Sequence, residues 1–225
     1  MTEPIQCIGF ILDGNRRWAK DKGIPKLLGH KAGFEKLEEC VRWVRDRGIP
    51  HMAAYVFSTE NWNREKEEVD YLMDLYREMA EEKFARLSKE GVAVRFVGKL
   101  EMLPEDLRKS MKDIEAKNVR EPKITVWICI SYGSRAEIAA AAKAISALGE
   151  EVTEENLRRH FWSANMPDLD IIVRTSGEKR LSNFLLWQAA YAELFFLEPR
   201  WPDFSEKMLD EILEEYASRH RRHGK

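Results

Sequence analysis

The sequence predicts an α/β fold in which a central, mostly parallel sheet of about six strands is flanked by helices. Short, near-continuous apolar runs, typical of strands buried on both faces, alternate along the chain with segments of helical periodicity. No internal repeat, low-complexity stretch or linker rich in Gly, Ser or Pro interrupts this alternation. We therefore expect residues 1–225 to form a single domain.

Six apolar runs mark the predicted strands, at residues 7–12, 52–57, 92–97, 124–131, 170–174 and 193–197. The last run is the least distinct, since it could also be the end of a helix. Apolar residues at three- and four-residue steps predict helices over 34–44 and from 69 to 88. Four further helices are indicated by a first-turn Pro104, the Ala-rich stretch 136–148, Thr153 as an N-cap and the charged segment 205–220.

Composition and charge restrict the classes of function. The net charge of −2 excludes polyanion binding by bulk charge, so any basic site must be local. The three cysteines lie in apolar runs without metal-ligand spacing, as expected for reduced core cysteines of a cytoplasmic protein. No apolar run approaches the ~20 residues that span a bilayer, and the first residues lack the features of a signal peptide.

Polar clusters follow four of the predicted strands, at the carboxyl ends where ligands bind in such folds. Asp13-Gly14-Asn15-Arg16-Arg17 follow the first run, and the clusters at 58–64, 131–135 and 174–183 follow the second, fourth and fifth. Arginine with backbone N–H groups at helix starts is the usual equipment for binding phosphate. An acid beside two arginines suits a metal ion and a multiply charged anion held together.

Each cluster alone also fits a plain structural role. Asp13-Gly14 could be an ordinary turn, Ser58 or Asn63 a helix cap, and His30 a capping or surface histidine. Motifs for other phosphate chemistry are absent: the chain has no GxxxxGK[ST] and no GxGxxG after its first strand. The Asp13 turn is similar to that of phosphatases with paired aspartates, but the partner position, Asn15, is an amide.

Several long, ordered motifs together resemble the cis-prenyltransferases, a family that includes undecaprenyl diphosphate synthase. They run nearly end to end, at residues 11–20, 29–33, 57–64, 172–178, 180–188, 191–194 and 201–204. The resemblance implies condensation of isopentenyl diphosphate with an allylic diphosphate primer, farnesyl or geranylgeranyl diphosphate, to a Z-polyprenyl diphosphate, with Mg²⁺ as cofactor. The trans-acting synthases use Asp-rich motifs, and this chain contains no Asp-Asp pair.

The resemblance also implies roles for individual residues. Asp13 would place Mg²⁺ against a diphosphate, Glu193 would complete the metal site, and Asn61 would serve proton removal. Because an amide is a weak base, we expect Asn61 to orient a diphosphate oxygen that takes the proton. The allylic diphosphate would be bound by Gly14, Asn15, Arg16, Arg17, Trp18, Lys26 and His30. A mobile loop would contribute Ser58, Thr59, Glu60, Trp62 and Arg64, and isopentenyl diphosphate would contact Arg174, Arg180, Leu181 and Ser182.

The basic tail and the apolar interior carry further expectations. The family's Arg-x-Gly ending is matched by Arg222 and Gly224, which implies that the tail reaches a partner's substrate in an obligatory homodimer. A solvated tail or a nucleic-acid patch are the plain alternatives, and we expect no nucleic-acid partner. An apolar product tunnel is expected along the 69–87 helix and residues such as Val56, Ile128 and Ile130, and transient contact with a membrane surface would release product.

Three departures from the family pattern affect the expected site. Lys26 stands where many members carry Arg, Ser176 where Gly is usual, and Lys179 where His is frequent. A charge is kept at Lys26, but the bidentate geometry of Arg is lost. Two other function classes remain: a non-catalytic partner subunit, which would lack equivalents of Asp13 and Arg17, and a phosphatase acting through Asp13.

Overall fold

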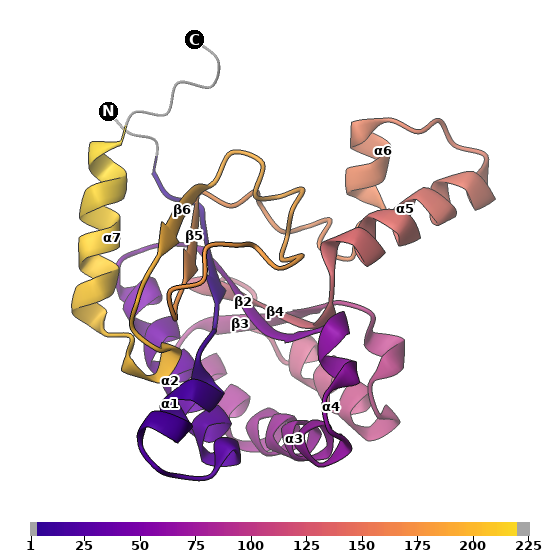
Figure 1. Cartoon of the computed structure of the whole chain (residues 1–225). Helices are drawn as coiled ribbons and strands as arrows, with labels where there is room; N and C mark the ends of the chain where they lie inside the picture. Colours follow the sequence, from indigo (N-terminus) through magenta and orange to yellow (C-terminus); the bar gives the residue numbers. More distant parts are fainter. Residues whose placement is uncertain (1–3, 220–225) are drawn as a thin grey trace.

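The computed structural model describes residues 4–219, and residues 79–85 by their backbone alone. Six parallel strands form one sheet in the order β3-β4-β2-β1-β5-β6 (Figure 1). The strands are β1 (Cys7–Ile11), β2 (His51–Ser58), β3 (Val92–Val97), β4 (Ile124–Tyr132), β5 (Ile171–Arg174) and β6 (Glu193–Phe196). All six predicted strands are confirmed, including the last, which is a strand rather than a helix end.

The predicted helices are present, with shifted ends. They are α2 (Lys26–Asp46), α3 (Lys66–Lys89), α4 (Glu105–Ala116), α5 (Ser134–Leu148), α6 (Glu154–Arg159) and α7 (Glu206–Ser218). Thr153 caps α6 as expected, because its Oγ1 accepts the N–H of Asn156 at 3.1 Å. Pro104 is the N-cap residue of α4 and so lies just before the first turn predicted for it. Helix α2 begins eight residues before the predicted stretch, directly after Pro25.

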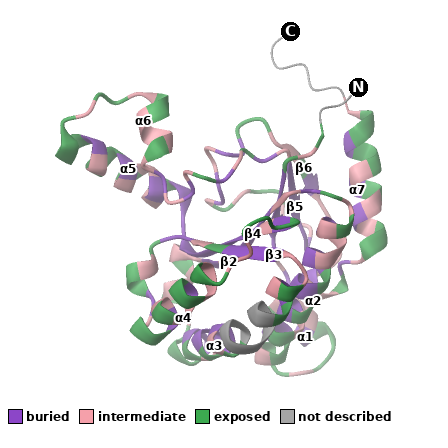
Figure 2. Ribbon diagram, turned by 180° about the vertical axis from the view of Figure 1, so that it is seen from behind, coloured by how far each residue is buried: buried purple, intermediate pink, exposed green. Residues whose placement is uncertain are grey.

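One face of the sheet is covered by helices. Figure 1 shows α2, α3 and α4 below the strands and α7 beside them, while α5 and α6 project away from the sheet. Phe10 and Ala54 point to this face and pack with Leu37 of α2, Leu72 of α3 and Leu209 of α7. The strands are buried here and the outer faces of the helices are exposed (Figure 2). This layer is the main core of the molecule.

The opposite face of the sheet is covered mainly by a loop. Ile11, Ala53 and Cys129 pack there against Phe184 and Leu185, which belong to the connection between β5 and β6. That connection forms turns rather than a helix, and Ser182, Asn183 and Leu185 have φ values of 49°, 65° and 42°. Left-handed residues interrupt helical hydrogen bonding, so the chain covers this face as a folded loop.

A short helix that the sequence pattern did not predict follows the first strand. Gly14 is the N-cap residue of helix α1 (Asn15–Asp21), and its φ of 105° is open to glycine and strained for other residues. Gly29 of α2 packs directly on α1, since a Cβ there would lie 2.2 Å from the carbonyl oxygen of Asn15. Among the described residues, no helix combines the length and apolar character that a bilayer crossing requires.

Candidate active site

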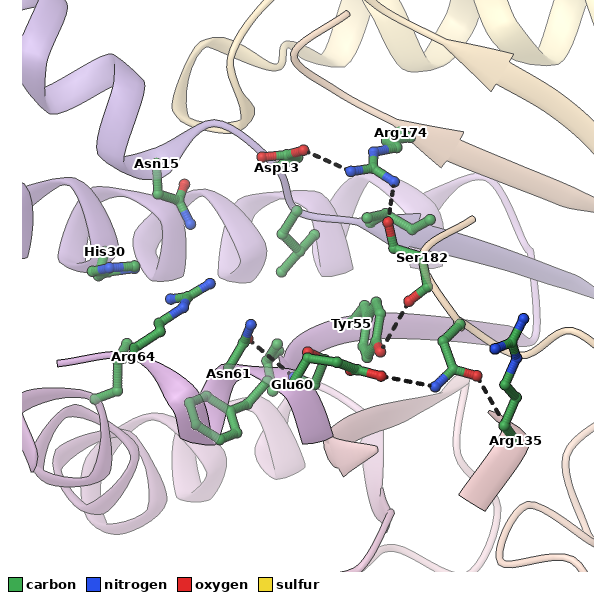
Figure 3. Close-up of a pocket in the computed structure, with 17 residues that line it drawn as sticks. Asp13, Asn15, His30, Tyr55, Glu60, Asn61, Arg64, Arg135, Arg174 and Ser182 are labelled. Carbon is green, nitrogen blue, oxygen red and sulfur yellow. Dashed lines mark hydrogen bonds and ion pairs between the residues drawn. The ribbon is translucent and has the colours of Figure 1, made fainter. Parts of the chain in front are cut away.

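The carboxyl ends of four adjacent strands surround one cavity of about 570 Å³. Asp13 follows β1, Ser58 ends β2, Arg135 follows β4 and Arg174 ends β5, and all four line the cavity (Figure 3). These strands occupy the middle of the sheet, and β3 lies at its edge. The structure therefore brings together the polar clusters that the sequence places after four strands, and it leaves out the third, as expected. Apolar side chains of Ile11, Leu12, Val56, Phe57 and Leu72 also line the cavity.

Asp13 is held between two arginines. Its Oδ2 accepts from an Nη of Arg174 at 2.8 Å and its Oδ1 accepts from an Nη of Arg17 at 3.1 Å. Its backbone carbonyl accepts from Oγ1 of Thr175 at 2.7 Å and from the N–H of Trp201 at 3.0 Å. Burial alone would raise the pKa of Asp13, but Arg174 and then Arg17 outweigh it and hold this pKa below its ordinary value. Asp13 is therefore an ionised, immobilised carboxylate.

The two arginines extend into two further sets of contacts. Arg174 is buried, and it donates to Oγ of Ser182 at 2.8 Å and to the backbone carbonyl of Arg180. Arg17 donates to one carboxylate oxygen of Glu178 at 2.9 Å, and Arg180 donates to the other at 2.6 Å. Glu178 thus connects Arg17, which is expected to bind the allylic diphosphate, with Arg180, which is expected to bind isopentenyl diphosphate.

A second carboxylate, Glu68, lies at the centre of the remaining basic side chains. It is 1% exposed, and Nη1 of Arg64 and Nε2 of His30 lie 3.0 and 3.2 Å from its Oε1. Arg16 and Lys26 each approach its Oε2 to 3.6 Å. Burial raises the pKa of Glu68, and the surrounding charges, led by Arg64 and Arg16, bring it below its ordinary value.

Sequence reasoning did not single out Glu68, and one signal could have found it. Acidic residues are common in the first turn of a helix, where they interact favourably with the helix dipole, so the sequence position of Glu68 indicates no further role. Its position four residues after Arg64 predicts an i, i+4 contact, and that contact is present. Arg16, Lys26, His30 and Arg64 were all expected at the site, and Glu68 is the carboxylate that holds them together.

The 58–64 loop forms the short 3₁₀ helix η1 (Thr59–Asn63) at the end of β2. Oδ1 of Asn61 accepts the backbone N–H of Ser58 at 3.1 Å, so the expected cap involves Ser58 and Asn61 rather than Asn63. This contact uses the side-chain oxygen of Asn61, so its Nδ2 is the group that can donate to a ligand in the cavity that Asn61 lines. Trp62 is turned toward β4, where its Nε1 donates to Oγ of Ser131 at 2.9 Å.

The Gly14 turn is tightly enclosed. A Cβ at Gly14 would lie 2.7 Å from Oγ of Ser176, which accepts from Arg200 at 2.8 Å. Ser176 itself has a φ of 82°, in the left-handed region where the family's usual Gly is unstrained.

Three other predicted site residues make contacts of their own. Trp18 on α1 donates from Nε1 to Asp203 at 2.8 Å. Lys26 forms an ion pair with Glu65, and Leu181 packs against the core of the second face.

Glu193 is not near Asp13 within this chain. It opens β6 beside Ile171 and forms an ion pair with Arg219 at 2.6 Å, whereas Asp13 follows the other end of the sheet. The strand register places the two acids about five residues apart along the strands, which is roughly 17 Å at 3.3 Å per residue. Arg222 and Gly224 lie outside the described residues.

The side chains at the site fit a Mg²⁺ ion whose remaining ligands are supplied by substrate phosphates. The described residues contain no group of three or more His, Cys, Asp or Glu side chains that could hold a metal ion by themselves. Mg²⁺ commonly binds one or two carboxylates together with substrate phosphates and water. Asp13 provides one such carboxylate, ionised and surrounded by arginines that suit a phosphate.

Comparisons with known proteins agree with this geometry. The family model described as undecaprenyl diphosphate synthase matches residues 11–224. The chain belongs to the undecaprenyl diphosphate synthase family. It is 44% identical to the isoprenyl transferase of Thermotoga maritima, over 97% of this chain and 96% of the relative. It is also 41% identical to a trans,polycis-polyprenyl diphosphate synthase of Thermobifida fusca that is (2Z,6E)-farnesyl diphosphate specific, over 96% of this chain and 79% of the relative.

A solved structure supports the same family at the level of the fold. The lavandulyl diphosphate synthase of Lavandula x intermedia, in complex with dimethylallyl diphosphate, superposes with a TM-score of 0.93 at 29% identity, over 98% of each chain. Family membership makes this chain a prenyltransferase of the undecaprenyl diphosphate synthase type. The resemblance seen in the sequence motifs is therefore confirmed.

Proposed function

We propose that the chain is a Mg²⁺-dependent, homodimeric cis-prenyltransferase that adds isopentenyl diphosphate to an allylic primer. Farnesyl or geranylgeranyl diphosphate is the proposed primer, and the product is a Z-polyprenyl diphosphate. The position of Asp13 between Arg17 and Arg174 carries the proposal, because one ionised carboxylate lies between two sets of basic side chains that suit a phosphate. The (2Z,6E)-farnesyl diphosphate specificity of the Thermobifida fusca relative supports a primer of this length.

The two diphosphates are proposed to bind on opposite sides of Asp13. Arg16, Arg17 and Lys26 on one side bind the allylic diphosphate, with the N–H groups that open α1. Arg174, Arg180 and Ser182 on the other side bind isopentenyl diphosphate. Asp13 would hold Mg²⁺, which when bound would neutralise charge on the departing diphosphate. Several such contacts are required, because micromolar affinity needs about 8 kcal/mol and each charged hydrogen bond contributes about 1.5–3 kcal/mol.

The loop residue Asn61 would orient a diphosphate oxygen rather than abstract the proton itself. An amide is a very weak base, and Oδ1 of Asn61 already accepts from Ser58. Its Nδ2 is therefore proposed to donate to a diphosphate oxygen. That oxygen takes the proton that the carbocation formed by condensation loses as the new double bond forms. Val56, Phe57 and Leu72 line the apolar side of the cavity and are proposed to receive the growing chain.

Product chromatography tests the proposal. Purified chain incubated with farnesyl diphosphate, isopentenyl diphosphate and Mg²⁺ should yield longer prenyl diphosphates, and chelation of Mg²⁺ should abolish them. Turnover by the single purified chain excludes a purely supporting subunit. Release of inorganic phosphate from prenyl diphosphates without isopentenyl diphosphate would instead indicate a phosphatase and contradict the proposal.

Two parts of the proposal are tested separately. Light scattering coupled to gel filtration should give twice the mass of the chain if the homodimer is correct. Transient membrane contact predicts that detergent or lipid vesicles accelerate turnover by removing the apolar product. An absence of any such effect would count against a role for the membrane surface in product release.

A further inference from the structure

Asn183 joins three segments at the edge of the cavity. Its Oδ1 accepts the backbone N–H of Arg135 at 2.9 Å, and its Nδ2 donates to Oε1 of Glu60 at 3.1 Å (Figure 3). Its backbone carbonyl accepts the N–H of Ser134 at 2.9 Å. One side chain therefore connects the β5–β6 connection with the start of α5 and with the 58–64 loop.

The backbone around this contact is built for close approach. Ser182 and Asn183 have left-handed φ values of 49° and 65°, a conformation that asparagine tolerates better than most residues. A Cβ at Gly133 would lie 2.6 Å from Nδ2 of Asn183 and 2.7 Å from Oγ1 of Thr59. The missing side chain at Gly133 lets the three segments meet at one point.

This contact lies between two parts of the site that act on different groups. On one side, Ser182 precedes Asn183 and accepts from Arg174 at 2.8 Å. On the other side, Glu60 precedes Asn61 in the loop that closes one wall of the cavity. Glu60, Arg174, Ser182 and Asn183 all line the same cavity. The path from the isopentenyl side to Asn61 is thus a short series of hydrogen-bonded groups.

We propose that Asn183 is a positioning residue that couples the isopentenyl diphosphate subsite to the 58–64 loop. This inference rests on the proposed function, since it assigns the Arg174–Ser182 side to isopentenyl diphosphate. A diphosphate bound by Arg174 and Ser182 fixes the left-handed backbone at 182–183. The amide of Asn183 then holds Glu60, and with it Asn61, over the reacting carbons. The coupling is reciprocal, so an ordered loop also favours diphosphate binding.

The decisive variant is Asn183→Gly, because glycine keeps the left-handed backbone and removes the amide. We expect kcat/KM for isopentenyl diphosphate to fall about tenfold, the effect of one lost hydrogen bond to a charged group. Binding of the allylic diphosphate alone should be unchanged. The matched control is Asn118→Ala, whose amide bonds only the backbone of Val94 on β3 among the described contacts. That variant should leave the kinetics of both substrates unchanged.

A double variant tests the coupling itself. Asn183→Gly combined with Glu60→Ala should lose no more than the worse single variant, because both remove the same link. Fully additive losses, or an Asn183→Gly variant with unchanged kinetics for isopentenyl diphosphate, would overturn the inference.

Hydrogen exchange gives a readout that does not require turnover. With inorganic diphosphate as the probe, the amides of residues 58–64 should gain protection in the wild type and gain none in Asn183→Gly. Equal protection in both, or none in the wild type, would contradict the coupling. A wild type that never consumes isopentenyl diphosphate would refute the proposed function, and the exchange comparison would still decide the role of Asn183.

Discussion

Asp13 and Arg174, which follow and end two neighbouring parallel strands, form an ion pair of 2.8 Å at the centre of the site. The pair is possible because the register sets Ile11 beside Arg174, so Asp13 lies just beyond the guanidinium. Arg174 also donates to Ser182, and Asp13 also accepts from Arg17. This pair therefore links the two groups of residues to which we assign the two diphosphates.

The planar guanidinium of Arg174 should not be replaceable by lysine. Arg174→Lys keeps the positive charge but cannot serve Asp13, Ser182 and the carbonyl of Arg180 together. We expect kcat/KM for isopentenyl diphosphate to fall about 10- to 100-fold, with a smaller effect on the allylic primer. Steady-state kinetics with each substrate varied in turn measure this, and equal losses for both substrates would argue against the assignment of sides.

His30 should make stability depend on pH. Burial lowers the pKa of His30 from its ordinary 6.5, and the charge of Glu68 opposes the shift only in part. The unfolded chain then binds a proton at higher pH than the folded chain, so the free energy of unfolding falls as the pH drops below about 6.5. His30→Gln should flatten this slope between about pH 7 and pH 5. Denaturant unfolding at several pH values measures it, and an unchanged slope would show that His30 titrates normally.

Gly29 should be required for the packing of α1 on α2. An added Cβ would lie 2.2 Å from the carbonyl oxygen of Asn15 and 2.9 Å from Cβ of Ala19, so the helices must move apart. Gly29→Ala should therefore destabilise the fold by about 1–3 kcal/mol. This loss is expected although alanine has a higher intrinsic helix propensity than glycine. The exposed Glu35→Ala in the same helix is the control. A Gly29→Ala variant as stable as the wild type would show that the two helices are not closely packed.

The apolar side of the cavity should set product length. Val56 and Leu72 both line the cavity, and Val56 is only partly buried. Val56→Trp would fill space that the growing chain needs, so shorter products should accumulate while the first condensation continues. Met102→Trp, at an exposed position, should leave the product distribution unchanged. Chromatography of the products decides between these outcomes, and an unaltered distribution in Val56→Trp would refute the proposed tunnel.

Much of the fold and of the site could be predicted because strand ends are marked in the sequence. The apolar run before Asp13 and the run before Arg174 predicted both strands and the edge where these residues meet. The covering of the second face could not be predicted, since the turns around Asn183 depend on left-handed backbone that no local pattern marks. Helix α1 was missed because its seven residues are too few for a clear period.

Long-range partners were the other limit. Glu68 carries an ordinary first-turn signature, and only the tertiary fold shows that Arg16, Lys26 and His30 converge on it. Glu193 showed the reverse: its motif implied a metal ligand beside Asp13, but the parallel register places it at the other end of the strands. A metal role for Glu193 stays a prediction that the geometry of one chain does not support.

The most direct test of the account is the turnover of Asp13→Ala. If Asp13 positions Mg²⁺ and the arginines around it, kcat should fall by about 100- to 1,000-fold or more. Circular dichroism and the unfolding midpoint should show that the fold survives, and Asp113→Ala, at an exposed position of α4, should retain full activity. Near-normal formation of prenyl products by folded Asp13→Ala would contradict the central claim.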